Sequence, residues 1–82
     1  MSIRDAIEEL EDRKKNTRFK RLVAICAEVF VAPRIRGGHH IFKTPWPGDP
    51  RINLQKVTGV AKPYQIRQVL AALKKLTESQ PR

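Results

Sequence analysis

The 82-residue sequence has little cysteine, few acidic side chains after residue 16 and no long hydrophobic run. Its single cysteine, Cys26, excludes an internal disulfide framework and is typical of a protein in a reducing cytoplasm. The longest apolar stretch, VAICAEVFVA, is interrupted by Glu28 and falls far short of the ~20 residues that a membrane-spanning helix needs. The charged start, MSIRDAIEELEDRKK, lacks the apolar segment of a secretory signal. These absences favour a small cytoplasmic protein with no membrane association.

Positive charge is what the sequence has in excess, with a formal net charge of +9 at pH 7. Residues 1–16 carry five acidic and four basic side chains, whereas residues 17–82 carry thirteen basic and only three acidic ones. The hydrophobic content of 40% indicates a chain that folds rather than a disordered one. A folded cationic body favours a polyanionic partner, most often a nucleic acid.

Three segments have the apolar spacing of helices. The segment 2–14 has a narrow apolar stripe along one face of the expected helix, with Ser2 as the expected N-cap. A second helix is expected between Thr17, its predicted cap, and Pro33. Its inward stripe is Phe19, Leu22, Val23, Cys26, Ala27 and Phe30, which makes Cys26 a buried, inert thiol. The last helix begins at Pro63, and its stripe is Ile66, Val69, Leu70, Leu73 and Leu76.

Between the second and third helices the apolar period becomes two. The segments RIR, HHIFKT and RINLQKV predict three short strands. Gly37-Gly38 predicts a tight hairpin between the first two, and TPWPGDP predicts a longer loop before the third. Three antiparallel strands with helices on one face make an α+β sandwich of order α-α-β-β-β-α, whose other sheet face is open to solvent.

Strand alternation then assigns the two histidines of the sequence to opposite faces. If Phe42 points to the helices, His40 shares its side and His39 faces solvent. The open face then also carries Ile41, Lys43, Arg34, Arg36, Arg51, Asn53 and Gln55. A slip of one residue in register would exchange the roles of His39 and His40, so both assignments remain open at this stage.

The sequence GGHHIFK, within this order of elements, resembles the HicA toxins of type II toxin–antitoxin modules. These are small mRNA-cleaving ribonucleases with a fold like that of double-stranded-RNA-binding domains. The family signature is glycine, serine and histidine, then two variable residues and an aromatic, and it maps onto residues 37–42 with Gly38 in place of the serine. The resemblance covers about residues 17–77. It implies a ribonuclease domain at residues 17–82, preceded by an N-terminal helical extension at residues 1–16.

The resemblance implies that His39 is the single catalytic residue of a metal-independent endoribonuclease that acts on mRNA without a cofactor. Imidazole is suited to this role because it takes up and releases protons near neutral pH. The residues expected to bind RNA are Arg34, Arg36, Gly37, Lys43, Arg51 and Asn53. The implied partner is a HicB-type antitoxin that covers the cationic face and His39, with operator DNA reached only through that antitoxin.

Alternatives stay open beside this hypothesis. The same sheet and charges suit a non-catalytic RNA-binding module with the same fold. His40 is expected to be a packing or solvated residue, and a tandem His-His without cysteine or carboxylate makes a poor metal site. Trp46 suits stacking on a base or covering the sheet edge. The N-terminal helix could drive oligomerisation, or its acidic face could fold back over the basic sheet or add to the antitoxin contact.

Overall fold

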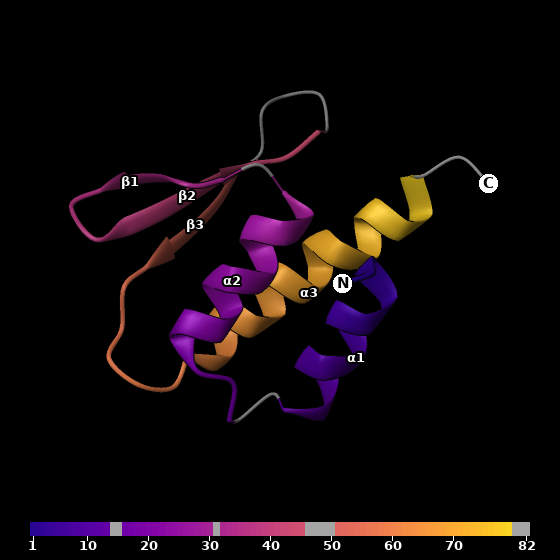
Figure 1. Cartoon of the computed structure of the whole chain (residues 1–82), viewed down its shortest axis with the longest axis horizontal. Helices are drawn as coiled ribbons and strands as arrows, with labels where there is room; N and C mark the ends of the chain where they lie inside the picture. The colour runs from indigo at the N-terminus through magenta and orange to yellow at the C-terminus, as the bar shows by residue number, and fades with distance from the viewer. Residues whose placement is uncertain (14–15, 31, 46–50, 80–82) are drawn as a thin grey trace.

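The computed structural model describes residues 1–13, 16–30, 32–45 and 51–79. Its elements are α1 (Ile3–Asp12), α2 (Phe19–Val29), β1 (Arg34–Arg36), β2 (His39–Lys43), β3 (Arg51–Gln55) and α3 (Pro63–Ser79). The strands form one antiparallel sheet in the order β1-β2-β3. Helices α2 and α3 cover one face of this sheet (Figure 1). The α+β class and the order of elements are therefore as predicted.

The hydrophobic core lies between the sheet and the helices. Phe42, Ile52 and Leu54 point into it from β2 and β3, and the predicted stripe of α3 meets them. In α2 the buried face is rotated slightly from the predicted one, because Ile25 is fully buried while Ala27 is exposed. Cys26 is buried as predicted, and this burial raises the pKa of its thiol to about 12. The thiol therefore stays neutral and unreactive in the folded protein.

A two-glycine turn joins β1 to β2. Gly37 and Gly38 both have positive φ, at 52° and 85°, in the left-handed region that a side chain disfavours. This is the backbone of the tight hairpin that the sequence predicted. The carbonyl of Gly38 also accepts a hydrogen bond of 2.8 Å from the Lys56 amide, just beyond β3. The start of β2 is thus held by the turn from β1 and by the hydrogen bond from Lys56.

Helix α1 belongs to the same core as the rest of the chain. Ser2 caps it through a 3.0 Å bond from the Asp5 amide, as predicted, and Ala6 and Leu10 are fully buried. It packs against α3, on the side of the helices away from the sheet (Figure 1). The suggestion that its acidic face lies over the basic sheet is therefore wrong, because its apolar stripe needs the helices as a partner.

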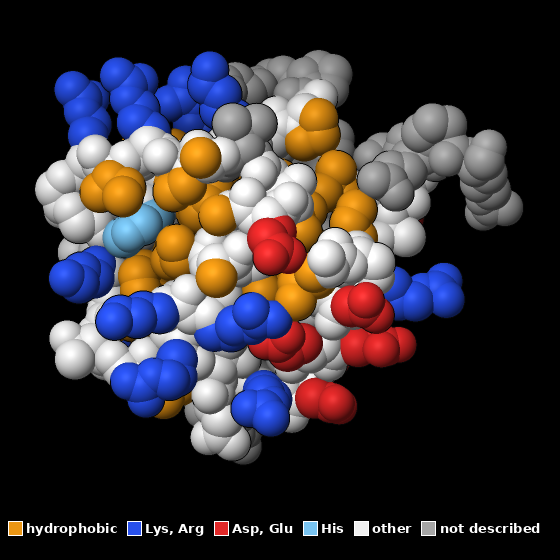
Figure 2. All heavy atoms as spheres, in the orientation of Figure 1, with side chains coloured by type: hydrophobic (Ala, Val, Ile, Leu, Met, Phe, Trp, Pro, Cys, Tyr) orange, Lys and Arg blue, Asp and Glu red, His pale blue; other side chains and the backbone are white. Residues whose placement is uncertain are grey.

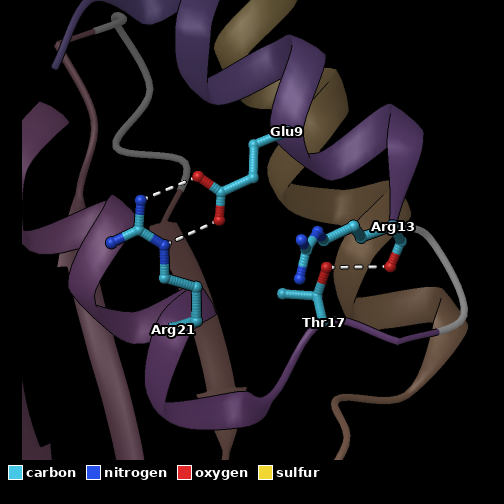
Figure 3. A network of polar contacts seen from close by, with 4 residues as sticks. All are labelled: Glu9, Arg13, Thr17 and Arg21. Atoms are coloured by element: carbon cyan, nitrogen blue, oxygen red, sulfur yellow. Dashed lines mark hydrogen bonds and ion pairs between the residues drawn. The ribbon is translucent and has the colours of Figure 1, made fainter.

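Carboxylates of α1 pair with cations of the neighbouring helices. Glu9 accepts two hydrogen bonds of 2.7 Å from the Arg21 guanidinium on α2 (Figure 3). Glu11 forms an ion pair of 2.9 Å with Lys74 on α3. The hydrogen bonds from Arg21 hold the pKa of Glu9 below its ordinary value. The acidic side chains of α1 thus serve its own docking.

Thr17 does not cap α2, contrary to the prediction. The N-cap is Arg18, whose side chain makes no capping bond. Thr17 is buried instead, and its hydroxyl donates to the Arg13 carbonyl at 2.9 Å (Figure 3). Its own carbonyl accepts from the Ala61 amide at 2.8 Å. The residue closes the turn between α1 and α2 rather than starting the next helix.

A buried glutamine ties the start of α3 to the end of the sheet. The side-chain oxygen of Gln65 accepts from the Lys62 amide at 3.0 Å, and its amide nitrogen donates to the Gln55 carbonyl at 2.9 Å. Both ends of the buried amide are therefore satisfied, as burial of a polar group requires.

Among the described helices, none is both long and apolar enough to cross a membrane.

Candidate nucleic-acid interface

The strand register places His39 on the open face of the sheet. In β2, Phe42 is fully buried toward the helices, so His40 lies on that side and His39 on the other. The pairing of β2 with both neighbours confirms this assignment, because directly opposed residues share a face. The alternative in which the two histidines exchange roles is thereby excluded.

The open face is organised in rows across the three strands. Arg36 and Gln55 flank His39, Arg34 and Asn53 flank Ile41, and Arg51 lies opposite Lys43. All four predicted cations of the face, Arg34, Arg36, Lys43 and Arg51, are exposed, as are Asn53 and the turn residue Gly37. No residue of β1, β2 or β3 is acidic. In Figure 2 lysine and arginine side chains stand in a row along the upper left edge of the molecule, and the acidic side chains lie away from it, from the centre to the lower right, beside further lysine and arginine side chains.

His39 is held by a side-chain hydrogen bond from the neighbouring strand. Its Nδ1 lies 2.9 Å from Oδ1 of Asn53, which is one row further along β3. The amide oxygen can only accept, so Nδ1 donates the proton. A neutral ring in this tautomer keeps its lone pair on Nε2, the nitrogen that can remove a proton from a ligand.

Distance along the strands separates the cations into two groups. Arg36 is directly opposite His39, where antiparallel partners are about 5 Å apart at Cα. Lys43 and Arg51 lie four residues away along the strands, or roughly 13 Å at 3.3 Å per residue. Of these three cations, only Arg36 is beside His39, whereas Lys43 and Arg51 are placed to contact a more distant part of an extended ligand.

His40 has a different environment. Its ring packs edge-on against Phe19 of α2, with centroids 5.4 Å apart and an interplanar angle of 73°. Its Nδ1 is buried and has no hydrogen-bond partner among the described residues. The residue is therefore a packing residue, one of the two roles expected for it. Trp46, considered for base stacking, lies outside the described residues.

Two features of the site were not predicted from the sequence. Gln55 was placed on the open face but not recognised as the direct neighbour of His39, and Asn53 was assigned to RNA rather than to the imidazole. Both follow from the register between β2 and β3, which are joined by a longer loop rather than by the two-residue turn. Comparison with known proteins finds no matching family model, no similar curated protein and no similar solved structure.

Proposed function

We propose that this protein is a metal-independent endoribonuclease of the HicA type, the toxin of a type II toxin–antitoxin module that cleaves mRNA in the cytoplasm. The observation that carries the proposal is the His39–Asn53 pair on an open cationic sheet face. The order of elements after α1 is compatible with a fold like that of double-stranded-RNA-binding domains. The signature around His39 and the net charge support the same assignment.

The chemistry proposed for His39 begins at the unprotonated Nε2. This nitrogen removes the proton of a ribose 2′-hydroxyl, and O2′ attacks the adjacent phosphorus. The bond from phosphorus to O5′ breaks, and O5′ takes a proton from water, which leaves a 2′,3′-cyclic phosphate and a 5′-hydroxyl. The imidazolium then returns its proton to the solvent hydroxide, which restores the neutral ring. Asn53 keeps Nδ1 protonated throughout, and Arg36 is the nearest cation for the charge that builds on the phosphate oxygens.

The side chains around His39 support cleavage without a metal. The side chains of the strands beside His39 are arginine, glutamine, asparagine and isoleucine, with no carboxylate to hold a divalent cation. The same set contains no second acid–base group among the described residues of the face. A single imidazole contributes roughly 10²–10⁴-fold in rate, so slow turnover is expected.

The proposal includes a partner. A HicB-type antitoxin with acidic surface would neutralise the open face and cover His39, and operator DNA would be bound only through that antitoxin. The competing function is an RNA-binding module without catalysis. It uses the same cations, and Gly38 in place of serine is compatible with it.

The test combines binding and cleavage of a single-stranded RNA in EDTA. We expect binding, cleavage, and products that carry a cyclic phosphate. A matched oligonucleotide with 2′-deoxyribose throughout should bind but remain intact, because it lacks the nucleophile. Binding of RNA without any cleavage would favour the RNA-binding module, and cleavage of the deoxy substrate would contradict the proposed chemistry.

A further inference from the structure

A groove with apolar walls opens on the helix side of the sheet, away from His39. It has a volume of about 500 Å³ and lies between the start of α2 and the β1–β2 hairpin. Phe19 and Val23 line it from α2, and Ile35 and His40 line it from the strands. Ile35 is 62% exposed, an unusual position for a large aliphatic side chain on the core side of a sheet. On this view of the surface, a histidine lies among hydrophobic side chains with lysine and arginine side chains close by (Figure 2).

The groove continues along the connector between β3 and α3. A second hollow of about 340 Å³ shares Phe19, Lys20 and Lys56 with the first and extends past Val57 and Gly59. Because they share these residues, the two hollows adjoin and form one depression that is larger than a single side chain would need.

The rim of this depression is cationic and unneutralised. Arg18, Lys20 and Lys56 are exposed, and none of them pairs with a carboxylate among the described residues. Arg21 and Lys74, by contrast, are matched by Glu9 and Glu11 of α1. Among the residues that the structure describes, no acidic one lines either hollow. Carboxylates of α1 thus pair with cations on the far side of the helices, and no described carboxylate lines the groove.

The walls distinguish between candidate occupants. A nucleobase binds by stacking on an exposed aromatic face and by hydrogen bonds to its edges. Phe19 is only 5% exposed and its ring meets that of His40 edge-on, so the well-exposed apolar side chain of the walls is the aliphatic Ile35. A second copy of this chain has its carboxylates concentrated on α1, but the apolar residues Ala6 and Leu10 beside them are buried in its own core. Neither occupant supplies exposed aliphatic anchors together with negative charge. An acidic peptide with aliphatic side chains supplies both.

We propose that this groove is a docking site for an acidic, aliphatic segment of another protein, whose apolar side chains pack on Phe19, Val23 and Ile35 while its carboxylates pair with Lys20 and Lys56. The site does not depend on the ribonuclease proposal, since it uses none of the residues of the open face. A protein bound here leaves His39 accessible, because the groove and His39 are on opposite faces of the sheet.

The probe is a short synthetic peptide of alternating leucine and glutamate, added to the ¹⁵N-labelled full chain and followed by NMR. We expect saturable shifts at Phe19, Val23, Ile35 and Lys56, with His39 and Asn53 unchanged. A matched peptide of alternating serine and glutamate should bind far more weakly, because it lacks the apolar anchors. Shifts confined to the open face, equal binding of both peptides, or no saturable binding would each overturn the proposal.

Two exposed positions make the test specific. Ile35→Asp should weaken binding of the leucine peptide by about tenfold or more, since it removes an apolar contact and adds a like charge. Lys20→Glu should also weaken it several-fold, whereas Arg67→Glu, the same charge change on an exposed face of α3, should have much less effect.

Two further outcomes would assign the groove to a ligand other than an acidic peptide. Displacement of the peptide from the groove by single-stranded RNA would assign the site to nucleic acid. A dimer in sedimentation that Ile35→Asp dissociates would assign it to a second copy of the chain.

Discussion

The imidazole of His39 and the side-chain amide of Asn53 form a hydrogen bond of 2.9 Å across neighbouring strands. The two residues are diagonal rather than directly opposite, since His39 pairs with Gln55 and Asn53 with Ile41. The bond orients the ring toward the diagonal neighbour through Nδ1, so Nε2 is the nitrogen that can meet a ligand. It gives a solvent-facing histidine a defined tautomer and direction.

Asn53→Ala should release the ring without removing it. With the acceptor lost, His39 samples both tautomers and more orientations, so we expect RNA cleavage to fall by roughly ten- to a hundredfold. The ¹⁵N shifts of the imidazole should move from the Nδ1–H pattern to a mixture. Asn53→Asp is the control, because its carboxylate also accepts from Nδ1. An unchanged tautomer in Asn53→Ala would show that the bond does not hold the ring.

Arg34 should contribute to RNA affinity rather than to the chemical step. It is exposed on the open face, one row away from His39. Arg34→Gln should weaken binding to all RNA sequences alike and reduce the salt dependence of binding by about one phosphate contact. Arg67→Gln on α3 is the matched control and should change neither quantity. An equal effect of both variants would indicate a general charge effect and not a localised interface.

Leu10 should carry much of the stability that α1 adds. Its side chain is fully buried in the common core, so Leu10→Ala should lower the free energy of unfolding by about 2–5 kcal/mol. Glu8→Ala, which truncates an exposed side chain of the same helix, should lower the free energy of unfolding much less. Urea denaturation measures both. If α1 instead drove oligomerisation, Leu10→Ala would lower the mass in solution and leave the monomer stable.

The Glu9–Arg21 pair should make the free energy of unfolding fall as the pH is lowered into the acid range. Because hydrogen bonding by Arg21 lowers the pKa of Glu9 from its ordinary value of 4.5, the folded state is favoured above that pH. The contribution is lost as pH falls through the lowered pKa. Both side chains are partly exposed, so Glu9→Gln should cost only about 0.2–1 kcal/mol at neutral pH. The difference from the unsubstituted protein should vanish in acid, and a difference that stays constant with pH would contradict this account.

The elements of this fold could be predicted because each has a local signal. Alternation in RINLQ, the glycine pair and the stripe after Pro63 all depend on residues within one segment. The position of α1 could not be predicted in this way. Its apolar stripe and its acidic face gave two competing surfaces for docking, and only the packing against α3 decides between them.

The candidate site shows the same limit. The face of His39 followed from alternation, but its contact with Asn53 needed the register between β2 and β3, which are separated in sequence by a loop. The groove beside Phe19 combines α2, two strands and the connector after β3, so no sequence motif marks it.

The most direct measurement compares RNA cleavage by two single variants in EDTA. His39→Ala removes the ring on the open face, and His40→Phe removes the ring packed against Phe19 while keeping an aromatic side chain there. We predict that His39→Ala lowers the cleavage rate by roughly 10²–10⁴-fold with RNA binding retained, and that His40→Phe cleaves normally. Cleavage that survives His39→Ala, or is lost only in a folded His40→Phe, would contradict the assignment of His39 as the catalyst.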